Sequence, residues 1–129
     1  MESFEELNIS KQLLNAITDM GFEKPTPIQE EAFPIAMSGK NIVGIAQTGT
    51  GKTLAYMLPI LQQFKFSKDY KPKAIILVPT RELVIQVVEQ IELFTKYMTT
   101  RVLGVYGGVN IKTQMGQLTQ GVDIVVGTP

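Results

Sequence analysis

The sequence predicts an α/β fold in which a mostly parallel sheet carries helices on both faces. Four short apolar runs, at residues 42–45, 74–78, 102–106 and 123–127, are typical of strands, and a segment of helical periodicity follows each of the first three. Strands that alternate with helices favour right-handed crossovers, which join parallel strands. An eight-residue glycine-rich stretch separates the first strand from its helix, at the end of the strand where such sheets bind ligands.

Two more helices are predicted ahead of the first strand. The first extends over residues 10–21, with a serine that can cap it and a glycine that can end it. The second has Thr26 as its cap and Pro27 as its first helical residue, and Gln29 can complete a capping box with Thr26. We expect this helix to run to about Ser38.

The later part of the chain contains two helices of its own, at about 81–97 and 111–118. The run at 74–78 shows no alternation of apolar and polar residues, so we expect that strand to be buried on both faces. Pro34 and Pro59 fall inside predicted helices. Because proline lacks a backbone N–H group, we expect a kink or an early break at both positions.

The glycine-rich stretch, residues 46–53, reads Ala-Gln-Thr-Gly-Thr-Gly-Lys-Thr and is suited to a polyphosphate. Gly49 and Gly51 allow left-handed backbone angles that turn several N–H groups toward one anion. Lys52 adds a positive charge, Thr53 adds a hydroxyl, and the N-terminus of the next helix faces the same point. The usual pattern begins with glycine where this chain has alanine. The alternative is a simple turn with a solvated lysine.

Composition limits the chemistry that the chain can perform. The 129 residues carry twelve basic and twelve acidic side chains, and 44% are hydrophobic, which is ordinary for a globular protein. The sequence contains no cysteine and no histidine, which excludes disulfides and thiolate metal sites and removes the commonest general base. With zero net charge, a case for nucleic-acid binding has to rest on particular residues.

Nothing in the sequence predicts contact with a membrane. No apolar run approaches the roughly 20 residues that a membrane-spanning helix needs. The N-terminus is acidic, whereas a signal peptide begins with basic residues. We therefore expect a cytoplasmic protein.

Polar and glycine residues follow each later strand. Pro79, Thr80 and Arg81 come after the second strand, Gly107-Gly108 after the third, and Thr128 after the fourth. Since the carboxyl ends of parallel strands meet at one edge, we expect four loops on one rim, the phosphate-binding stretch included. Simpler roles remain open: a helix cap for Thr80, a tight turn for the glycines and a surface charge for Arg81.

Together these segments make the chain similar to the first half of a DEAD-box ATP-dependent RNA helicase of the bacterial type. The resemblance covers essentially all of the chain. The family itself carries alanine where this chain has Ala46, and the chain has Val84 where alanine is usual. The matching segments are Phe4 with residues 21–29 for the adenine-reading Q motif, 46–53 for motif I, 79–86 for motif Ia, Gly107-Gly108 for the GG motif, and Thr128-Pro129 for the opening of motif Ib.

The resemblance implies a P-loop NTPase fold of the RecA-like kind, present here in incomplete form. Residues 1–38 would supply N-terminal helices with the Q-motif-like segment. Residues 39–129 would be the first part of the RecA-like ATP-binding domain, ending within motif Ib.

The resemblance also implies residues that contact ATP and Mg²⁺. Lys52 would contact the β- and γ-phosphates and Thr53 the Mg²⁺, which makes these two the candidate catalytic residues. Gln29 would read adenine through its side-chain amide, although it could instead serve only the capping box. The implied ATP-contacting set is Phe4, Phe22, Lys24, Gln29, Gln47, Thr48, Gly49, Thr50, Gly51, Lys52, Thr53 and Leu54.

The implied partners are RNA, single-stranded or duplex, and a second RecA-like domain. RNA would be held by its sugar-phosphate chain without base reading. No carboxylate here matches the Asp-Glu-Ala-Asp segment, so we expect residues 1–129 alone to lack hydrolysis and unwinding. The alternatives are another P-loop NTPase, such as a kinase or small GTPase, and a non-catalytic nucleotide- or protein-binding module. The implied RNA-contacting residues are Pro79, Thr80, Arg81, Gly107, Gly108 and Thr128.

Strand order in this family leads to one more expectation. The strand at 42–45 would not pair with the strand at 74–78, because strands that would follow Pro129 lie between them. The edges of both strands would then carry unpaired backbone groups. We therefore expect residues 1–129 alone to be aggregation-prone or molten.

Overall fold

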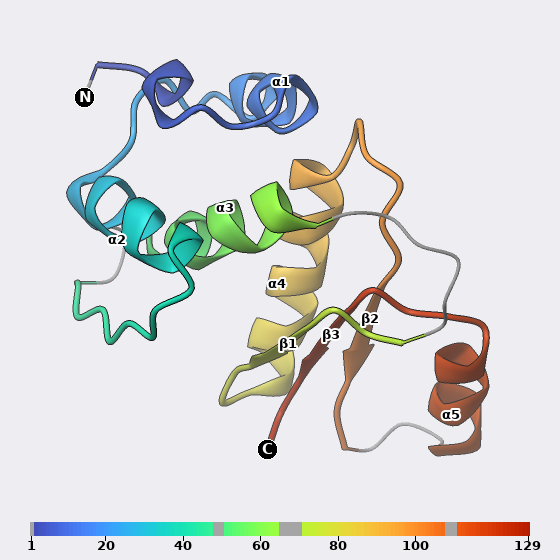
Figure 1. Ribbon diagram of the computed structural model, residues 1–129. Coiled ribbons are helices and arrows are strands. Elements are labelled where there is room, and N and C mark those ends of the chain that lie inside the picture. Colours follow the sequence, from blue (N-terminus) through green and yellow to red (C-terminus); the bar gives the residue numbers. More distant parts are fainter. Residues whose placement is uncertain (1, 48–50, 65–70, 108–110) are drawn as a thin grey trace. The chain divides into compact units, whose positions relative to one another are not determined.

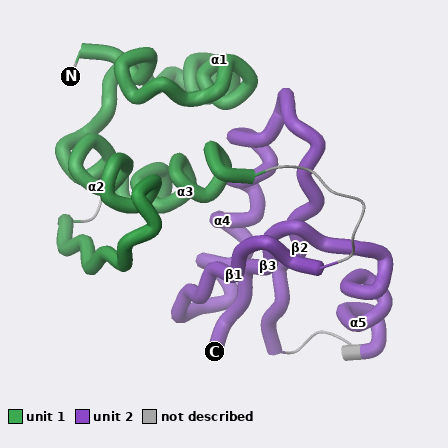
Figure 2. Tube along the Cα trace, viewed as in Figure 1, with its two compact units in different colours: residues 1–64 green, residues 65–129 purple. Residues whose placement is uncertain are grey.

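The chain divides into two compact units, residues 1–64 and 65–129 (Figure 2). The computed structural model describes residues 2–47, 51–64, 71–107 and 111–129. In this described part, no helix combines the length and the apolar character needed to span a bilayer. The sequence predicted a different boundary, at residue 38, between the Q-motif-like segment and the ATP-binding domain. That boundary is defined by motifs and not by packing, and it stays a prediction.

The first unit is helical in its described residues (Figure 1). Both N-terminal helices predicted from the sequence are present, and α2 packs against α3. Ser10 caps α1 as predicted, since its Oγ accepts from the N–H of Leu13 at 3.3 Å, and the N–H of Ser10 donates to Gln62 on α3 at 2.7 Å. The elements are a 3₁₀ turn at Phe4–Leu7, α1 at Lys11–Asp19, α2 at Pro27–Met37 and α3 at Lys52–Gln63.

The two helices that contain an internal proline continue through it. Pro34 lies inside α2 and Pro59 inside α3, so the early break expected at these positions is not seen. In both helices, packing holds the helix together despite the missing N–H group: Phe33 is buried beside Pro34, and Pro59 is itself buried. Helix α2 ends one residue before Ser38, close to the predicted position.

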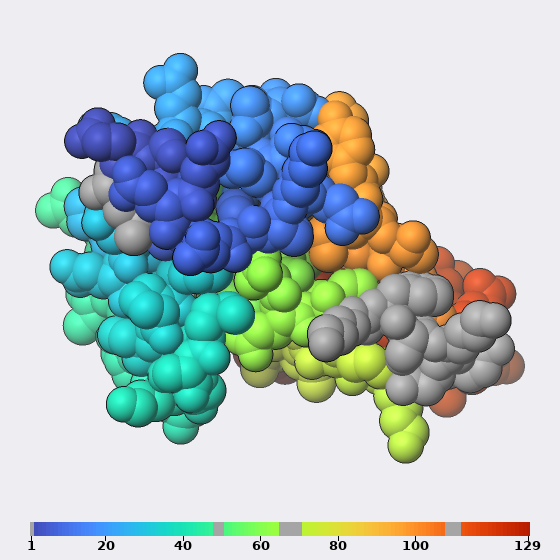
Figure 3. Space-filling view, turned by 45° about the horizontal axis from the view of Figure 1, so that its top comes forward, coloured from blue at the N-terminus to red at the C-terminus, as the bar shows by residue number. Residues whose placement is uncertain are grey.

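The apolar run at 42–45 forms no strand, and this corrects the predicted first strand. Val43 is 90% exposed and Ile45 is 92% exposed. A strand is stable only when a neighbouring strand pairs with its N–H and C=O groups, and no described segment pairs with this run. In the space-filling view, the teal part of the chain around residue 40 lies at the surface (Figure 3).

The second unit is built on a parallel sheet of three strands, where the sequence predicted four for the whole chain (Figure 1). Strand β3 lies between β1 and β2, and Leu77 of β1 and Val105 of β2 are both in register with Gly127 of β3. The predicted α/β alternation is confirmed for this unit. Its elements are β1 at Ala74–Leu77, α4 at Arg81–Phe94, β2 at Val102–Val105, α5 at Ile111–Thr119 and β3 at Ile124–Gly127.

Helix α4 covers one face of the sheet. Gly104 allows this, because a Cβ at this position would lie 2.9 Å from Val84 and 3.2 Å from Val88 on α4. On the other face, Ile75 and Leu77 are 70% and 66% exposed. The expectation that this strand is buried on both faces is therefore wrong: its apolar run is uniform, but α4 covers only one side.

Asp123 joins the amino ends of all three strands. Its C=O group accepts from the N–H groups of Lys73 and Ala74, at 2.7 and 3.2 Å, at the start of β1. Its carboxylate, fully buried, accepts from the backbone N–H of Arg101 at 2.8 Å and from two guanidinium nitrogens of Arg101 at 3.0 and 2.9 Å. Burial by itself raises the pKa of Asp123, but the hydrogen bonds and charge of Arg101 outweigh burial and hold this pKa below its ordinary value.

Candidate nucleotide and nucleic-acid sites

The start of α3 has the backbone geometry of an anion site. Gly51 immediately precedes the helix with φ of +84°, a left-handed conformation that glycine adopts without strain. The C=O of Gly51 accepts from the N–H of Ala55, so the N–H groups of Lys52, Thr53 and Leu54 have no acceptor within the helix. These groups and the positive end of the helix dipole suit a phosphate. Residues 48–50, which include three predicted phosphate contacts, lie outside the described residues.

Gln29 connects the start of α2 to this glycine. Its side chain is buried, with 1% exposed. The amide Oε1 accepts from the N–H of Thr26 at 2.9 Å, and Nε2 donates to the C=O of Gly51 at 3.1 Å. The first of these bonds is the predicted capping interaction, whereas the second was not foreseen. Gln29 therefore holds Gly51, the second glycine of the phosphate-binding stretch, in place.

The contact between Gln29 and Gly51 leaves no room for a larger residue at Gly51. A Cβ there would collide with the Nε2 atom of Gln29 and would lie 3.1 Å from Oγ1 of Thr26. That Oγ1 atom is buried and has no hydrogen-bond partner in the described part of the chain. The capping box formed by Thr26 and Gln29 therefore lies directly beside Gly51, which is required both for its backbone angle and for its small size.

Lys52 and Thr53 occupy the first turn of α3, as the sequence predicted. Lys52 is exposed and Thr53 is partly exposed, so both are open to a ligand. Burial raises the pKa of the Tyr56 hydroxyl, one turn further along, and a side-chain hydrogen bond with Thr53 offsets part of that rise.

The other predicted ATP contacts differ in their exposure. Phe22 is 39% exposed and Lys24 is exposed, both in the segment between α1 and α2, and Gln47 is exposed. Phe4, in contrast, is only 1% exposed and packs in the core of the first unit, so its ring is not open to a nucleotide in this structure. Leu54 is also buried, which leaves its backbone N–H rather than its side chain as the group for a phosphate.

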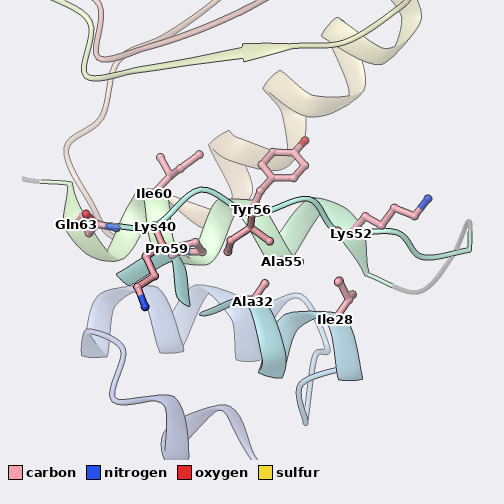
Figure 4. Close-up of a pocket in the computed structure, with 12 residues that line it drawn as sticks. Ile28, Ala32, Lys40, Lys52, Ala55, Tyr56, Pro59, Ile60 and Gln63 are labelled. Atoms are coloured by element: carbon pink, nitrogen blue, oxygen red, sulfur yellow. The ribbon is translucent and has the colours of Figure 1, made fainter. Parts of the chain in front are cut away.

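A pocket of about 490 Å³ lies between α2 and α3 (Figure 4). Its walls are apolar, with Ile28 and Ala32 from α2 and Tyr56 from α3 among them. In Figure 4, Lys52 lies on one side of the pocket and Lys40 lies on the other side, near Gln63. An apolar pocket suits hydrocarbon groups rather than phosphates, so the phosphate site is assigned to the helix start and not to this pocket.

In the second unit, the predicted RNA-contacting residues collect at the carboxyl ends of the three strands. The strands end in register, so the segments that follow them start at one edge. Pro79, Thr80 and Arg81 are exposed after β1, Gly107 is exposed after β2, and Thr128 is partly exposed after β3. The rim therefore has three strand ends rather than four, because the run before the phosphate-binding stretch is not a strand. Gly108 lies outside the described residues.

The simpler role of Thr80 is confirmed. Its Oγ1 atom accepts from the N–H of Leu83 at 3.2 Å and so caps α4. The N–H of Thr128 donates to the C=O of Val105 at 3.3 Å, which continues the pairing between β3 and β2 past the last strand residue. Both bonds fix the backbone of the rim and leave the exposed edge for a ligand.

Two residues of the rim were missed by the sequence reasoning. Tyr106, directly after β2, has its ring under the guanidinium of Arg81, with 4.8 Å between the guanidinium carbon and the ring centroid. Gln114 of α5 is buried, and its Nε2 atom donates to the C=O of Tyr106 at 3.2 Å. The only available signal was the aromatic residue next to the glycine pair. Among the described residues, no cluster of acidic, histidine or cysteine side chains could hold a metal ion by itself.

Comparison with known proteins gives consistent matches over the chain. The chain is 42% identical to the probable ATP-dependent RNA helicase DDX46 of Homo sapiens, over 100% of this chain and 13% of that protein. It is 46% identical to the DEAD-box ATP-dependent RNA helicase CshA of Bacillus cereus, over 100% of this chain and 24% of that protein. The crystal structure of a DEAD box protein from Methanococcus jannaschii matches with a TM-score of 0.89 and 42% identity, over 98% of this chain and 34% of that one.

These matches bear out both the predicted family and the predicted fold, a RecA-like parallel sheet with helices that is present in incomplete form. The chain spans only 13% to 24% of the length of the two curated relatives. The family model for the DEAD/DEAH box helicase matches residues 26–129, which include the helix start at Lys52 and the whole three-strand rim. The chain therefore belongs to the DEAD/DEAH box helicase family.

Proposed function

We propose that the protein containing this chain is an ATP-dependent RNA helicase, in which residues 1–129 supply part of the ATP site and part of the RNA-binding surface. The proposal is supported by the family and by relatives that carry this name. The observation that carries it is the start of α3, where left-handed Gly51, held by Gln29, precedes a helix with an exposed Lys52. A kinase or small GTPase would account for the glycine-rich stretch but not for the match through residues 26–129.

ATP would bind with its phosphates at the start of α3. Lys52 would contact the β- and γ-phosphates, the N–H groups of the first turn would surround them, and Thr53 would hold the Mg²⁺ that accompanies the nucleotide. Mg²⁺ neutralises charge on the phosphates when bound. No metal cluster is needed in this part of the chain for that, because nucleotide-bound Mg²⁺ keeps several waters and takes other ligands from the phosphates.

The adenine end of ATP would lie near the segment before α2. Phe22 and the stem of Lys24 are exposed enough to pack on the base. Gln29 uses one hydrogen and one lone pair of its amide within the protein, so one of each is left for a base edge. We infer that positioning Gly51 is the first role of Gln29 and that adenine contact is its second.

RNA would bind along the rim of the second unit through its sugar-phosphate chain. The exposed Arg81, the backbone of Gly107 and Thr128 offer donors that suit phosphate oxygens. Hydrolysis and unwinding would need a second RecA-like domain and acidic residues that match none in this chain. A cytoplasmic location stays a prediction from the sequence.

The experiment that tests the phosphate site is substitution of Lys52, the one charged residue in the stretch 46–53. Lys52→Ala should weaken ATP binding by about 1.5–3 kcal/mol in calorimetry, the range for losing a charge-assisted hydrogen bond. Lys40→Ala is the matched control, because Lys40 is also exposed and lies at the other end of the same pocket. Equal losses in the two variants, or none in either, would contradict the phosphate site.

A further inference from the structure

Tyr106 and Arg81 form a pair that spans the end of the central strand. Arg81 begins α4 shortly after β1, and Tyr106 directly follows β2, while β3 lies between those two strands. The 4.8 Å contact between guanidinium and ring therefore joins the two outer loops of the rim across the end of β3. Thr128 lies at that end.

Contacts within the second unit fix the positions of both Arg81 and Tyr106. Gly104 lets α4 approach β2 closely, which brings the start of α4 near the end of β2. The Thr80 cap fixes the first turn of α4, where Arg81 is located. Buried Gln114 holds the backbone of Tyr106 through its C=O group. The ring of Tyr106 is partly buried, so it presents a fixed face to Arg81.

The contact with the Tyr106 ring leaves hydrogen-bonding capacity on Arg81. The five N–H groups of a guanidinium point outward in its plane, whereas a cation–π contact uses the charge of the group and none of these donors. Arg81 is exposed and forms no ion pair with a carboxylate in the described part of the chain, so the edge of its guanidinium is open to an anion. Stacking also removes rotamer freedom that an unrestrained arginine would lose on binding.

We propose that Tyr106 is a positioning residue for RNA binding, whose ring holds the Arg81 guanidinium with its edge toward a phosphate of the RNA backbone. This inference rests on the proposed RNA-binding role of the rim. It assigns Tyr106 an effect that passes through Arg81, with no contact of its own to the RNA.

A double-mutant cycle tests this in the full protein encoded by the gene, with the affinity for a labelled oligouridine measured by fluorescence anisotropy. Arg81→Ala should weaken binding roughly 10- to 150-fold, as for a lost charge-assisted contact. Tyr106→Leu should weaken it about two- to five-fold, the value of an exposed cation–π pair, and Tyr106→Phe should restore it because phenylalanine keeps the ring face. In the Arg81→Ala background, Tyr106→Leu should have no further effect.

Tyr97→Leu is the matched control, since Tyr97 also stacks with a cation, Lys96, but lies beyond the end of α4 and away from the strand ends. It should leave RNA affinity unchanged. An additional loss from Tyr106→Leu in the Arg81→Ala background would show direct RNA contact and overturn the inference. So would an unchanged affinity in Tyr106→Leu alone. If Arg81→Ala itself has no effect, the RNA-binding role of the rim fails instead. Equal melting temperatures of the variants separate these results from unfolding.

Discussion

Similar apolar runs have different structures in the two units of the chain: one forms a buried strand, and the other is exposed and forms no strand. In residues 65–129, β3 is hydrogen-bonded on both sides by β1 and β2, and Ile124 and Val126 are completely buried. In residues 1–64, the run at 42–45 is just as apolar, yet Val43 and Ile45 are almost fully exposed. Apolar character therefore does not make a strand by itself. Backbone groups need a neighbouring strand, and only one of the two units supplies it among the described residues.

Helix caps, in contrast, are predicted correctly from the sequence in both units. Ser10 in the first unit and Thr80 in the second both cap their helices through the bond predicted from the sequence. A cap depends on residues three positions apart, so its partner is always present. The difference between the units thus lies in interactions between segments far apart in the sequence, and substitutions can test it.

The largest effect is expected at Asp123, which joins three strands of the second unit. Asp123→Ala should lower the free energy of unfolding by about 3 kcal/mol, because it removes several hydrogen bonds and leaves Arg101 without its buried partner. This is the low end of the range for buried pairs, since the Arg101 side chain is 28% exposed. Urea denaturation of the full protein measures the loss. Glu92→Ala, at an exposed carboxylate on α4, is the control and should change little.

The stability lost in Asp123→Ala should depend on pH, because Asp123 must be ionised to pair with Arg101. The pKa of Asp123 in the folded protein lies below the unfolded value of about 3.9. Its stabilisation is therefore complete above that value and is lost as pH falls through the lower, folded pKa. The gap between wild type and Asp123→Ala should be full at pH 7 and should shrink below about pH 4. A constant gap down to pH 2 would mean that the charge of Asp123 contributes nothing.

The second largest effect is expected at Gly51 in the first unit. Gly51→Ala should cost about 2–3 kcal/mol, from the left-handed backbone and from displacement of the Gln29 side chain. Gly39→Ala separates the two causes, because Gly39 has nearly the same φ, +83°, but open space around it. It should cost only about 1–2 kcal/mol. Thermal melts compare the variants, and identical losses would show that the contact with Gln29 is unimportant.

A smaller effect is expected when Gln29 loses its donor. Gln29→Glu keeps the acceptor for Thr26 but cannot donate to Gly51 when ionised, so it should cost about 1–2 kcal/mol at pH 7. Burial raises the pKa of the new carboxyl, and its protonated form can donate again, so the cost should decrease as pH falls. Gln63→Glu, at an exposed position of α3, is the control. If Gln29 also contacts adenine, Gln29→Glu should in addition lose the preference for ATP over GTP.

Much of the local structure could be predicted from the sequence, and the reasons are visible in particular residues. Thr26 and Pro27 define the start of α2, and the glycine-lysine-threonine sequence defines the start of α3. The parallel order of the later strands followed from their alternation with helices. These features depend on short stretches of chain, in which every interacting residue can be identified by its spacing.

The contacts between distant segments could not be predicted in the same way. The bond from Gln29 to Gly51 joins residues 22 positions apart, and the stacking of Tyr106 on Arg81 depends on Gly104 admitting α4. No periodicity or spacing encodes such pairs. The exposed run at 42–45 was misjudged for the same reason, because its apolar residues predict a strand but do not say whether a neighbour exists.

The smallest effect is expected at Val43, and it tests that misjudged run directly. In residues 1–129 alone, Val43→Lys should leave the far-UV circular dichroism unchanged, because the side chain is already 90% exposed, and should reduce light scattering by adding charge to an apolar surface. Val126→Lys is the matched comparison: the same change within β3 should abolish the far-UV circular dichroism of the sheet, since Val126 is completely buried. Loss of structure in both variants would show that the run is buried after all. In a longer chain that supplies a neighbouring strand, Val43→Lys should become costly, because pairing would enclose the side chain at residue 43 as it encloses Val126.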